Sequence, residues 1–265
     1  MAVDKMRSWF QPANNQPFSY IILVALAELL IAHYHTGMGL ALHIITLFAL
    51  FTHAAFLHHK EKERAQLLTV MAMAPLIRIA SLYTPLSSFH FIHWFLILSI
   101  PLFSCAFTII LVQHLHAQDI GLVFNFRKLH IQLAIASTGI LFGIIEYFIL
   151  HPHPLVIDLS FRSLAAPILI MFVCTGFLEE MIFRGIIQHN AVKYFNDNIG
   201  IFFTATLFAV MHIGNLSLID VVFVFFVGYF YGYAVKFTRS IIGVSISHGL
   251  TNIILFLIMP LVWTV

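Results

Sequence analysis

The chain has 265 residues, of which 61% are hydrophobic and only 9% charged, and its formal net charge is +2. An average soluble domain has about 25% charged residues, so this chain has too few charged groups to cover a water-exposed surface. The same figures exclude intrinsic disorder, which requires low hydrophobicity and high charge. No large basic cluster occurs, so the sequence excludes a nucleic-acid partner and indicates a protein of the lipid bilayer.

Long continuous apolar runs favour membrane-spanning helices over the alternating polarity of a β-barrel. Since a span needs about 20 apolar residues, the runs predict an all-α, polytopic membrane protein with nine transmembrane helices. We expect these helices near residues 18–36, 38–57, 66–84, 92–113, 130–150, 163–184, 199–214, 219–236 and 241–259.

Basic residues in the loops test this helix count. With nine spans, ten Lys and Arg residues fall on one side of the membrane, and only Arg162 lies in the opposite loops. The positive-inside rule makes the shared side cytoplasmic. We therefore expect a cytoplasmic N-terminus and an external C-terminus in the cell (inner) membrane. The ten residues are Lys5, Arg7, Lys60, Lys62, Arg64, Arg127, Lys128, Lys193, Lys236 and Arg239.

The segment from Gln118 to Leu129 has mixed polarity and separates the fourth span from the fifth. It is either an amphipathic helix on the membrane surface or a plain linker. We take it as the boundary between an N-terminal transmembrane region of unknown role, residues 1–118, and a C-terminal five-helix region, residues 119–259, that carries the site.

Ionisable groups inside predicted spans are costly, and each suggests a functional site. Glu28, Glu146 and Asp220 are isolated in the sequence. Each is interpreted as a protonated carboxyl that hydrogen-bonds to a neighbouring helix, and Arg78 is a candidate partner for one of them.

Two adjacent carboxylates, Glu179 and Glu180, lie in the sixth predicted span, and Arg184 follows Glu180 by four residues. That spacing places Glu180 and Arg184 on one helix face as an ion pair. Glu179 points about 100° away around the helix and is free to act as a general base. The structural alternative is a charge cluster that links helices.

Two more segments carry polar groups at a similar depth. His212 lies late in the seventh span, and His248 and Asn252 share one face of the ninth. At about 1.5 Å per residue, Glu179, His212, His248 and Asn252 lie roughly 21, 20, 14 and 20 Å below the cytoplasmic ends of their helices. These groups predict a wet cavity inside the bilayer.

A carboxylate beside an imidazole can deprotonate a water, and a second imidazole with an amide can stabilise an oxyanion. That set of groups suits hydrolysis of an amide bond. Alternatively, Glu179, His212 and His248 could bind Zn²⁺, which would activate the water. No HExxH helix, the usual signal of a zinc protease, is present.

The three segments together resemble, in order, the motifs of the CPBP family of intramembrane proteases: Glu179-Glu180-x-x-x-Arg184, Phe208-x-x-x-His212 and His248-x-x-x-Asn252. That family contains CAAX-processing endopeptidases of prenylated proteins and bacterial homologues linked to bacteriocin maturation or self-immunity (the Abi type). The resemblance covers about residues 119–259.

The resemblance implies a membrane endopeptidase that acts on a peptide or protein substrate. Glu179 would be the catalytic glutamate and His212 its partner in activating water. His248 and Asn252 would stabilise the oxyanion, and Glu180 and Arg184 would support the first motif. Two alternatives remain open: a non-catalytic binding or immunity protein on the same fold, and a proton-coupled transporter that uses the buried carboxylates.

Overall fold

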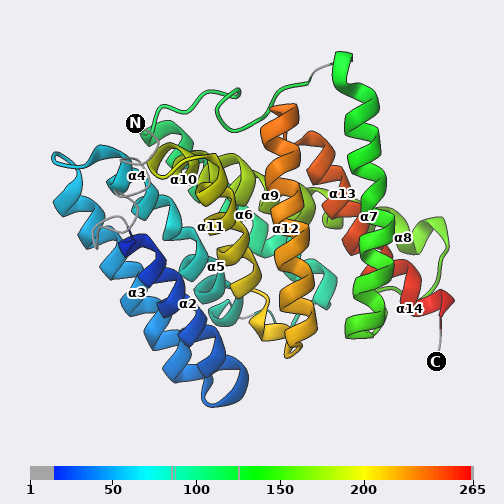
Figure 1. Cartoon of the computed structure of the whole chain (residues 1–265). Helices are drawn as coiled ribbons and strands as arrows, with labels where there is room; N and C mark the ends of the chain where they lie inside the picture. The colour runs from blue at the N-terminus through cyan, green and yellow to red at the C-terminus, as the bar shows by residue number, and fades with distance from the viewer. Residues whose placement is uncertain (1–14, 85, 87, 125, 264–265) are drawn as a thin grey trace.

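The structure, a computed structural model, describes residues 15–84, 86, 88–124 and 126–263. Within these ranges nine helices are long and apolar enough to cross a membrane, as predicted, and no strand occurs. The helices run roughly side by side, and both ends of the described chain lie on the outside of the bundle (Figure 1). Lys5 and Arg7, which contribute to the predicted orientation, lie outside the described residues.

Five helices form the first four spans. The third span is made of two helices separated at Ala72, three residues before Pro75. Pro75 has no N–H to donate to the carbonyl of Met71, so the continuous helix is interrupted there. The helices are α2 (Gln16–His33), α3 (Thr36–Leu57), α4 (Lys62–Met71), α5 (Met73–Tyr83) and α6 (Phe91–Val112).

The C-terminal part contains the other five spans. The described residues of the segment 118–129 form turns and one short 3-10 helix, η2 (Phe126–Lys128), so this segment is a linker. The remaining elements are α7 (Leu129–Leu150), α8 (Phe161–Ile170), η3 (Met171–Phe177), α9 (Leu178–Glu180), η4 (Met181–Ile187), α10 (Gln188–Tyr194), α11 (Asp197–Val210), η5 (Ile213–Asn215), α12 (Leu218–Thr238), α13 (Ile242–Ile253), η6 (Ile254–Ile258) and α14 (Met259–Val262).

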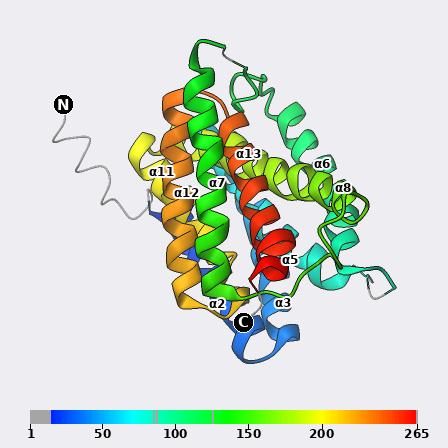
Figure 2. The same ribbon diagram turned by 90° about the vertical axis from the view of Figure 1, so that its right-hand side faces the viewer.

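The sixth span is longer than the predicted 163–184, because it continues from Phe161 to Tyr194, 34 residues. The polar residues beyond Arg184 do not end it. Gln188 donates to the carbonyl of Gly232 over 3.1 Å, and Asn190 donates to that of Ile186 over 3.0 Å. At about 1.5 Å per residue the length of this helix exceeds the roughly 30 Å thickness of a bilayer core. Its first part, α8, crosses the neighbouring helices at a large angle (Figure 2).

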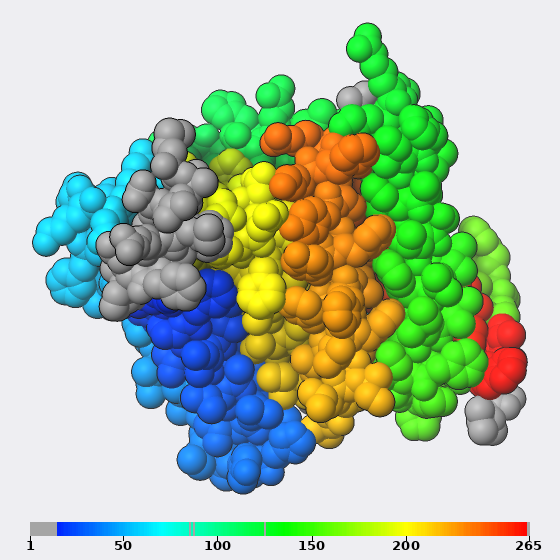
Figure 3. Space-filling view, viewed as in Figure 1, coloured from blue at the N-terminus to red at the C-terminus, as the bar shows by residue number. Residues whose placement is uncertain are grey.

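Helix α13 lies in the interior of the C-terminal part, where it packs mainly against α7 and η3. In space-filling view α2, α11, α12 and α7 line one face of the molecule (Figure 3). Large apolar side chains, including Phe148 of α7 and Phe226 of α12, are exposed on the outside. Such outward apolar side chains suit contact with lipid.

Glycines on α7 set its distance from α13. A Cβ added at Gly139 would lie 2.0 Å from the carbonyl oxygen of Ser247, and one added at Gly143 would lie 2.6 Å from that of Thr251. Small residues four apart allow two helix backbones to approach closely. The next position on this face of α7 is Glu146, so the same crossing turns Glu146 toward α13.

We therefore expect Gly143→Val to force α7 away from α13. Overpacking of this kind costs about 1–3 kcal/mol, because the clash is with backbone that has no alternative rotamer. Thermal unfolding of the purified protein in lipid nanodiscs should show a lower midpoint. Ile140→Val, at an exposed position of the same helix, is the control, and an equal midpoint for both variants would contradict the close crossing.

Candidate active site

The predicted pair between Glu180 and Arg184 is present. Nη1 of Arg184 donates to Oε1 of Glu180 over 2.8 Å, and both side chains are fully buried. The guanidinium also lies over the ring of Phe208, 4.2 Å from its centroid. Two π-helical segments, η3 and η4, flank the short helix that carries both glutamates, and π-bulges are frequent at functional sites.

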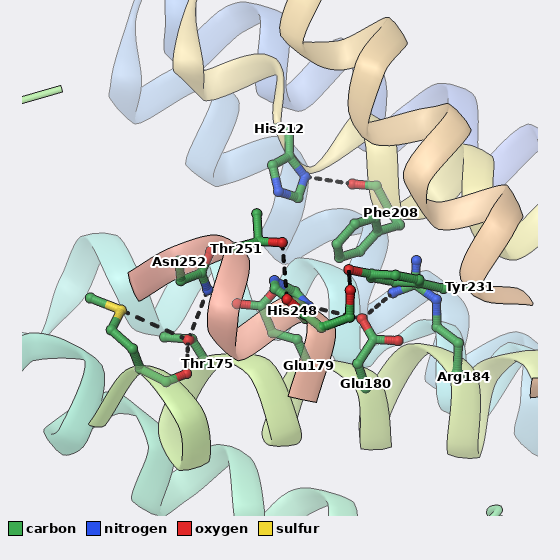
Figure 4. Close-up of polar contacts among 12 residues, drawn as sticks. Thr175, Glu179, Glu180, Arg184, Phe208, His212, Tyr231, His248, Thr251 and Asn252 are labelled. Carbon is green, nitrogen blue, oxygen red and sulfur yellow. Dashed lines mark hydrogen bonds and ion pairs between the residues drawn. The ribbon is translucent and has the colours of Figure 1, made fainter. Parts of the chain in front are cut away.

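His248 lies between the two glutamates (Figure 4). Its Nδ1 is 2.8 Å from Oε1 of Glu180, and its Nε2 is 3.8 Å from Oε2 of Glu179. Glu180 has no exposed side-chain surface, whereas the side chain of Glu179 is 34% exposed. Since Nδ1–H donates to Glu180, the ring presents Nε2 to Glu179, and an imidazolium would donate at both nitrogen atoms.

His212 lies two residues after the end of α11, and its ring packs against that of Phe208, with 4.7 Å between the ring centroids. Its Nδ1 is 2.9 Å from the carbonyl oxygen of Phe208 (Figure 4). That bond selects the tautomer with the proton on Nδ1. The other nitrogen, Nε2, is then an acceptor that can take a hydrogen bond, or a proton, from water.

Asn252 is oriented by the π-helical segment η3 of the long sixth span. Its Nδ2 donates to Oγ1 of Thr175 over 2.9 Å, and this hydroxyl in turn donates to the carbonyl of Met171. Thr175 precedes Glu179 by four residues and so occupies the same helix face. The four-residue spacing of Thr175 and Glu179 is visible in the sequence. The contact of Thr175 with Asn252, however, depends on the packing of α13 against η3.

A cavity of about 40 Å³ joins the histidines and the asparagine. Its volume exceeds the roughly 10–15 Å³ that a cavity needs to hold a water, so it has room for water. Glu179 is not among its lining residues. The lining comes from α7, α11, α12 and α13: Glu146, Phe208, His212, Phe223, Val224, Val227, Tyr231, His248, Thr251 and Asn252.

Glu146 is the residue whose place our sequence interpretation missed. Its expected hydrogen bond to a neighbouring helix does not occur among the described residues, and it lines the cavity instead. The sequence spacing of Gly139, Gly143 and Glu146 could have indicated this position, because it places the carboxyl on the same face of α7 as the two glycines that contact α13.

Tyr231 and Ser247 form a second polar group, also unrecognised, next to His248. The hydroxyl of Tyr231 donates to Oγ of Ser247 over 2.8 Å, and Oγ1 of Thr138 lies 2.9 Å from the same atom. These bonds connect α7, α12 and α13 beside the cavity and fix the position of the Tyr231 ring, which lies 6.4 Å from that of His248.

The metal alternative does not fit this arrangement. Among the described residues no three His, Cys, Asp or Glu side chains are grouped so that they could hold a metal ion. In particular, no described contact joins Glu179 to His212. The chemistry is therefore derived from the side chains alone.

A larger pocket, of about 290 Å³, lies on the other side of Arg184. Arg184 lines it and is also paired with Glu180, whose carboxylate contacts His248. At its rim the carboxyl of Asp119 accepts a hydrogen bond from the backbone N–H of His116, which lowers the pKa of Asp119. Basic side chains of the same rim include Lys193, Lys236 and Arg239.

The N-terminal part contacts the segment that carries His212. Arg78 on α5 donates from Nε to Oε1 of Glu28 over 2.7 Å and from Nη2 to the carbonyl of Met211 over 2.9 Å. Nε2 of His43 lies 3.3 Å from the same Glu28 oxygen, and both Glu28 and His43 are fully buried. Of the three carboxyls that were candidate partners of Arg78, Glu28 is the one that pairs with it. Arg78 also links the first spans to Met211, the residue before His212.

Comparison with known families agrees with the expected resemblance. Residues 161–254 match the family model of type II CAAX prenyl endopeptidases, Rce1-like. This segment is Rce1-like. It contains Glu179, Glu180, Arg184, His212, His248 and Asn252, and it begins where α8 begins. A search of curated proteins and of solved structures found no match.

The Rce1-like family is one of membrane endopeptidases, so the match confirms the predicted enzyme class and implies CAAX-type intramembrane protease activity. It covers about a third of the chain and does not reach α7 or the first four spans. The predicted boundary near residue 119 therefore stays a prediction.

Proposed function

We propose that this protein is an intramembrane endopeptidase in which Glu179 and His212 activate a water, and His248 and Asn252 stabilise the oxyanion. The observation that carries this proposal is the position of His248 between two carboxylates, at the edge of a cavity that His212 and Asn252 also line. The groups come from α9, from the segment after α11 and, for His248 and Asn252, from α13, and each has a hydrogen bond or close contact that orients it.

The reaction begins when a substrate amide reaches the cavity beside His248. Oε2 of Glu179 and Nε2 of His212 are the acceptors available for the protons of a water. The oxygen of that water bonds to the carbonyl carbon, and the carbonyl oxygen becomes an oxyanion. Nδ2 of Asn252 and Nε2–H of a protonated His248 then donate to the oxyanion. Glu180 stabilises the proton on Nδ1 of His248, and Arg184 keeps Glu180 in place.

The substrate is a peptide or protein that reaches the site from the bilayer or its surface, and the protein is proposed to reside in the cell membrane. Its N-terminus is proposed to be cytoplasmic, since ten basic residues share that side in a nine-span topology. Residues 1–118 are proposed as a supporting region, because Arg78 contacts the backbone next to His212.

Quantitative proteomics of membranes tests this function. Cells that express the wild-type protein should accumulate new peptide ends that are missing with Glu179→Gln, although both proteins reach the membrane in equal amounts. Glu63→Gln changes an exposed glutamate on α4 and serves as the control. Identical peptide ends in all three would contradict the proposal, and solute uptake into proteoliposomes that Glu179→Gln abolishes would favour the transporter instead.

A further inference from the structure

A carboxyl outside the Rce1-like segment lies in the same cavity as three of the expected site residues. Glu146 of α7 lines this space with His212, His248 and Asn252. This cavity, of about 40 Å³, has room for water, and water can bridge polar groups that line the same space. Water in this cavity can therefore connect Glu146 with a bond that is broken there.

Glu146 also differs from the other buried carboxyls of the described spans. Glu28 is bonded to Arg78, Glu180 to Arg184 and His248, and Asp220 to Asn215. Glu146 is only 8% exposed, and no hydrogen bond or ion pair joins its carboxyl to another described residue. A carboxyl held in an apolar helix bundle without a partner is costly in its ionised form.

The position of Glu146 is imposed by the backbone. Gly139 and Gly143 bring α7 so close to α13 that no side chain fits between them, and Glu146 follows on the same face. Such a crossing leaves the carboxyl few orientations other than toward the cavity. A structural role would instead require a bonding partner, and the described residues provide none.

We propose that Glu146 is the general acid of the reaction, and this rests on the proposed endopeptidase function. The protonated carboxyl donates its proton to the amide nitrogen of the tetrahedral intermediate as the carbon–nitrogen bond breaks, and the electron pair of that bond stays on the nitrogen. The products are a carboxylic acid and an amine. The proton that Glu179 took from water returns to Glu146 through water, which resets both groups.

A general acid matters most when the leaving group is a poor one. Expulsion of an amine from an amide requires protonation of its nitrogen, whereas an ester with an acidic alcohol leaves without help. Kinetics should therefore be measured with two substrates that share one cleaved peptide sequence and differ only in an amide or an activated ester at the scissile bond.

We expect Glu146→Gln to lower kcat for the amide about 100- to 10,000-fold and to lower kcat for the ester less than about tenfold, with KM unchanged. Glu146→Asp, which keeps a carboxyl, should retain part of the amide activity and shows whether a fold defect explains the loss. Glu63→Gln is the matched control.

Equal losses on the amide and the ester, or normal amide cleavage by Glu146→Gln, would overturn the general-acid role. The proposed function fails by a different result, namely normal cleavage of both substrates by Glu179→Gln. The two failures are therefore distinguishable in one set of assays.

Discussion

Arg184→Met is expected to destabilise the protein strongly. In the described spans, we expect this loss of stability to exceed that from replacing any other cation that pairs with a buried carboxylate. The substitution leaves Glu180 fully buried without the cation to which Oε1 is bonded over 2.8 Å. Removal of one partner of a buried ion pair costs about 3–5 kcal/mol. Thermal unfolding in nanodiscs should show this as a drop of roughly 6–20 °C in Tm, on the scaling for chains of this size.

The double variant Glu180→Gln, Arg184→Met separates two contributions to the loss of stability: loss of the ion pair itself, and burial of an unpaired carboxylate. Because the double variant leaves no isolated carboxylate, its Tm should lie above that of Arg184→Met. Lys236→Met is a matched control, since Lys236 and Asp197 form an ion pair of 3.0 Å whose side chains are 38% and 53% exposed. Exposed pairs contribute little, so a control as destabilised as Arg184→Met would contradict the cost assigned to the unpaired Glu180.

Arg78→Met is expected to have the second largest effect, and to affect cleavage as well. It leaves Glu28 buried without its cation, again at a cost of about 3–5 kcal/mol, and it removes the donor to the carbonyl of Met211. His212 follows Met211 directly. We therefore expect a lower Tm together with a lower kcat at temperatures where the variant is fully folded.

The double variant Glu28→Gln, Arg78→Met distinguishes these two effects. It should recover part of the lost Tm, because no unpaired carboxylate remains, but not the lost kcat, because the carbonyl of Met211 still lacks its donor. Recovery of both would show that Arg78 acts through stability alone. Recovery of neither would contradict the cost assigned to the unpaired Glu28.

Much of the architecture follows from hydropathy and spacing. The number of spans and the pair of Glu180 with Arg184 are local properties, since the first depends on apolar run length and the second on helix periodicity. The error in the sixth span has a physical reason as well. Gln188 and Asn190 look like the end of a membrane helix, yet both are buried with their amides bonded to backbone carbonyls.

The composition of the cavity could not be obtained in the same way. Glu146 is separated from His248 by about a hundred residues of sequence, and only the crossing of α7 over α13 brings them together. The family resemblance implied His212 as the partner of Glu179, whereas the closest partner of Glu179 among these groups is His248, at 3.8 Å. Contacts between helices depend on rotation and tilt, which run length does not specify.

Mass spectrometry of peptide products tests most directly whether side chains from several helices activate one water to cleave a peptide bond within the membrane. Purified wild-type protein and folded Glu179→Gln are compared on one substrate in nanodiscs. We expect cleavage by the wild-type protein and a rate at least about 100-fold lower for Glu179→Gln. Equal rates for the two proteins would contradict the proposed hydrolysis.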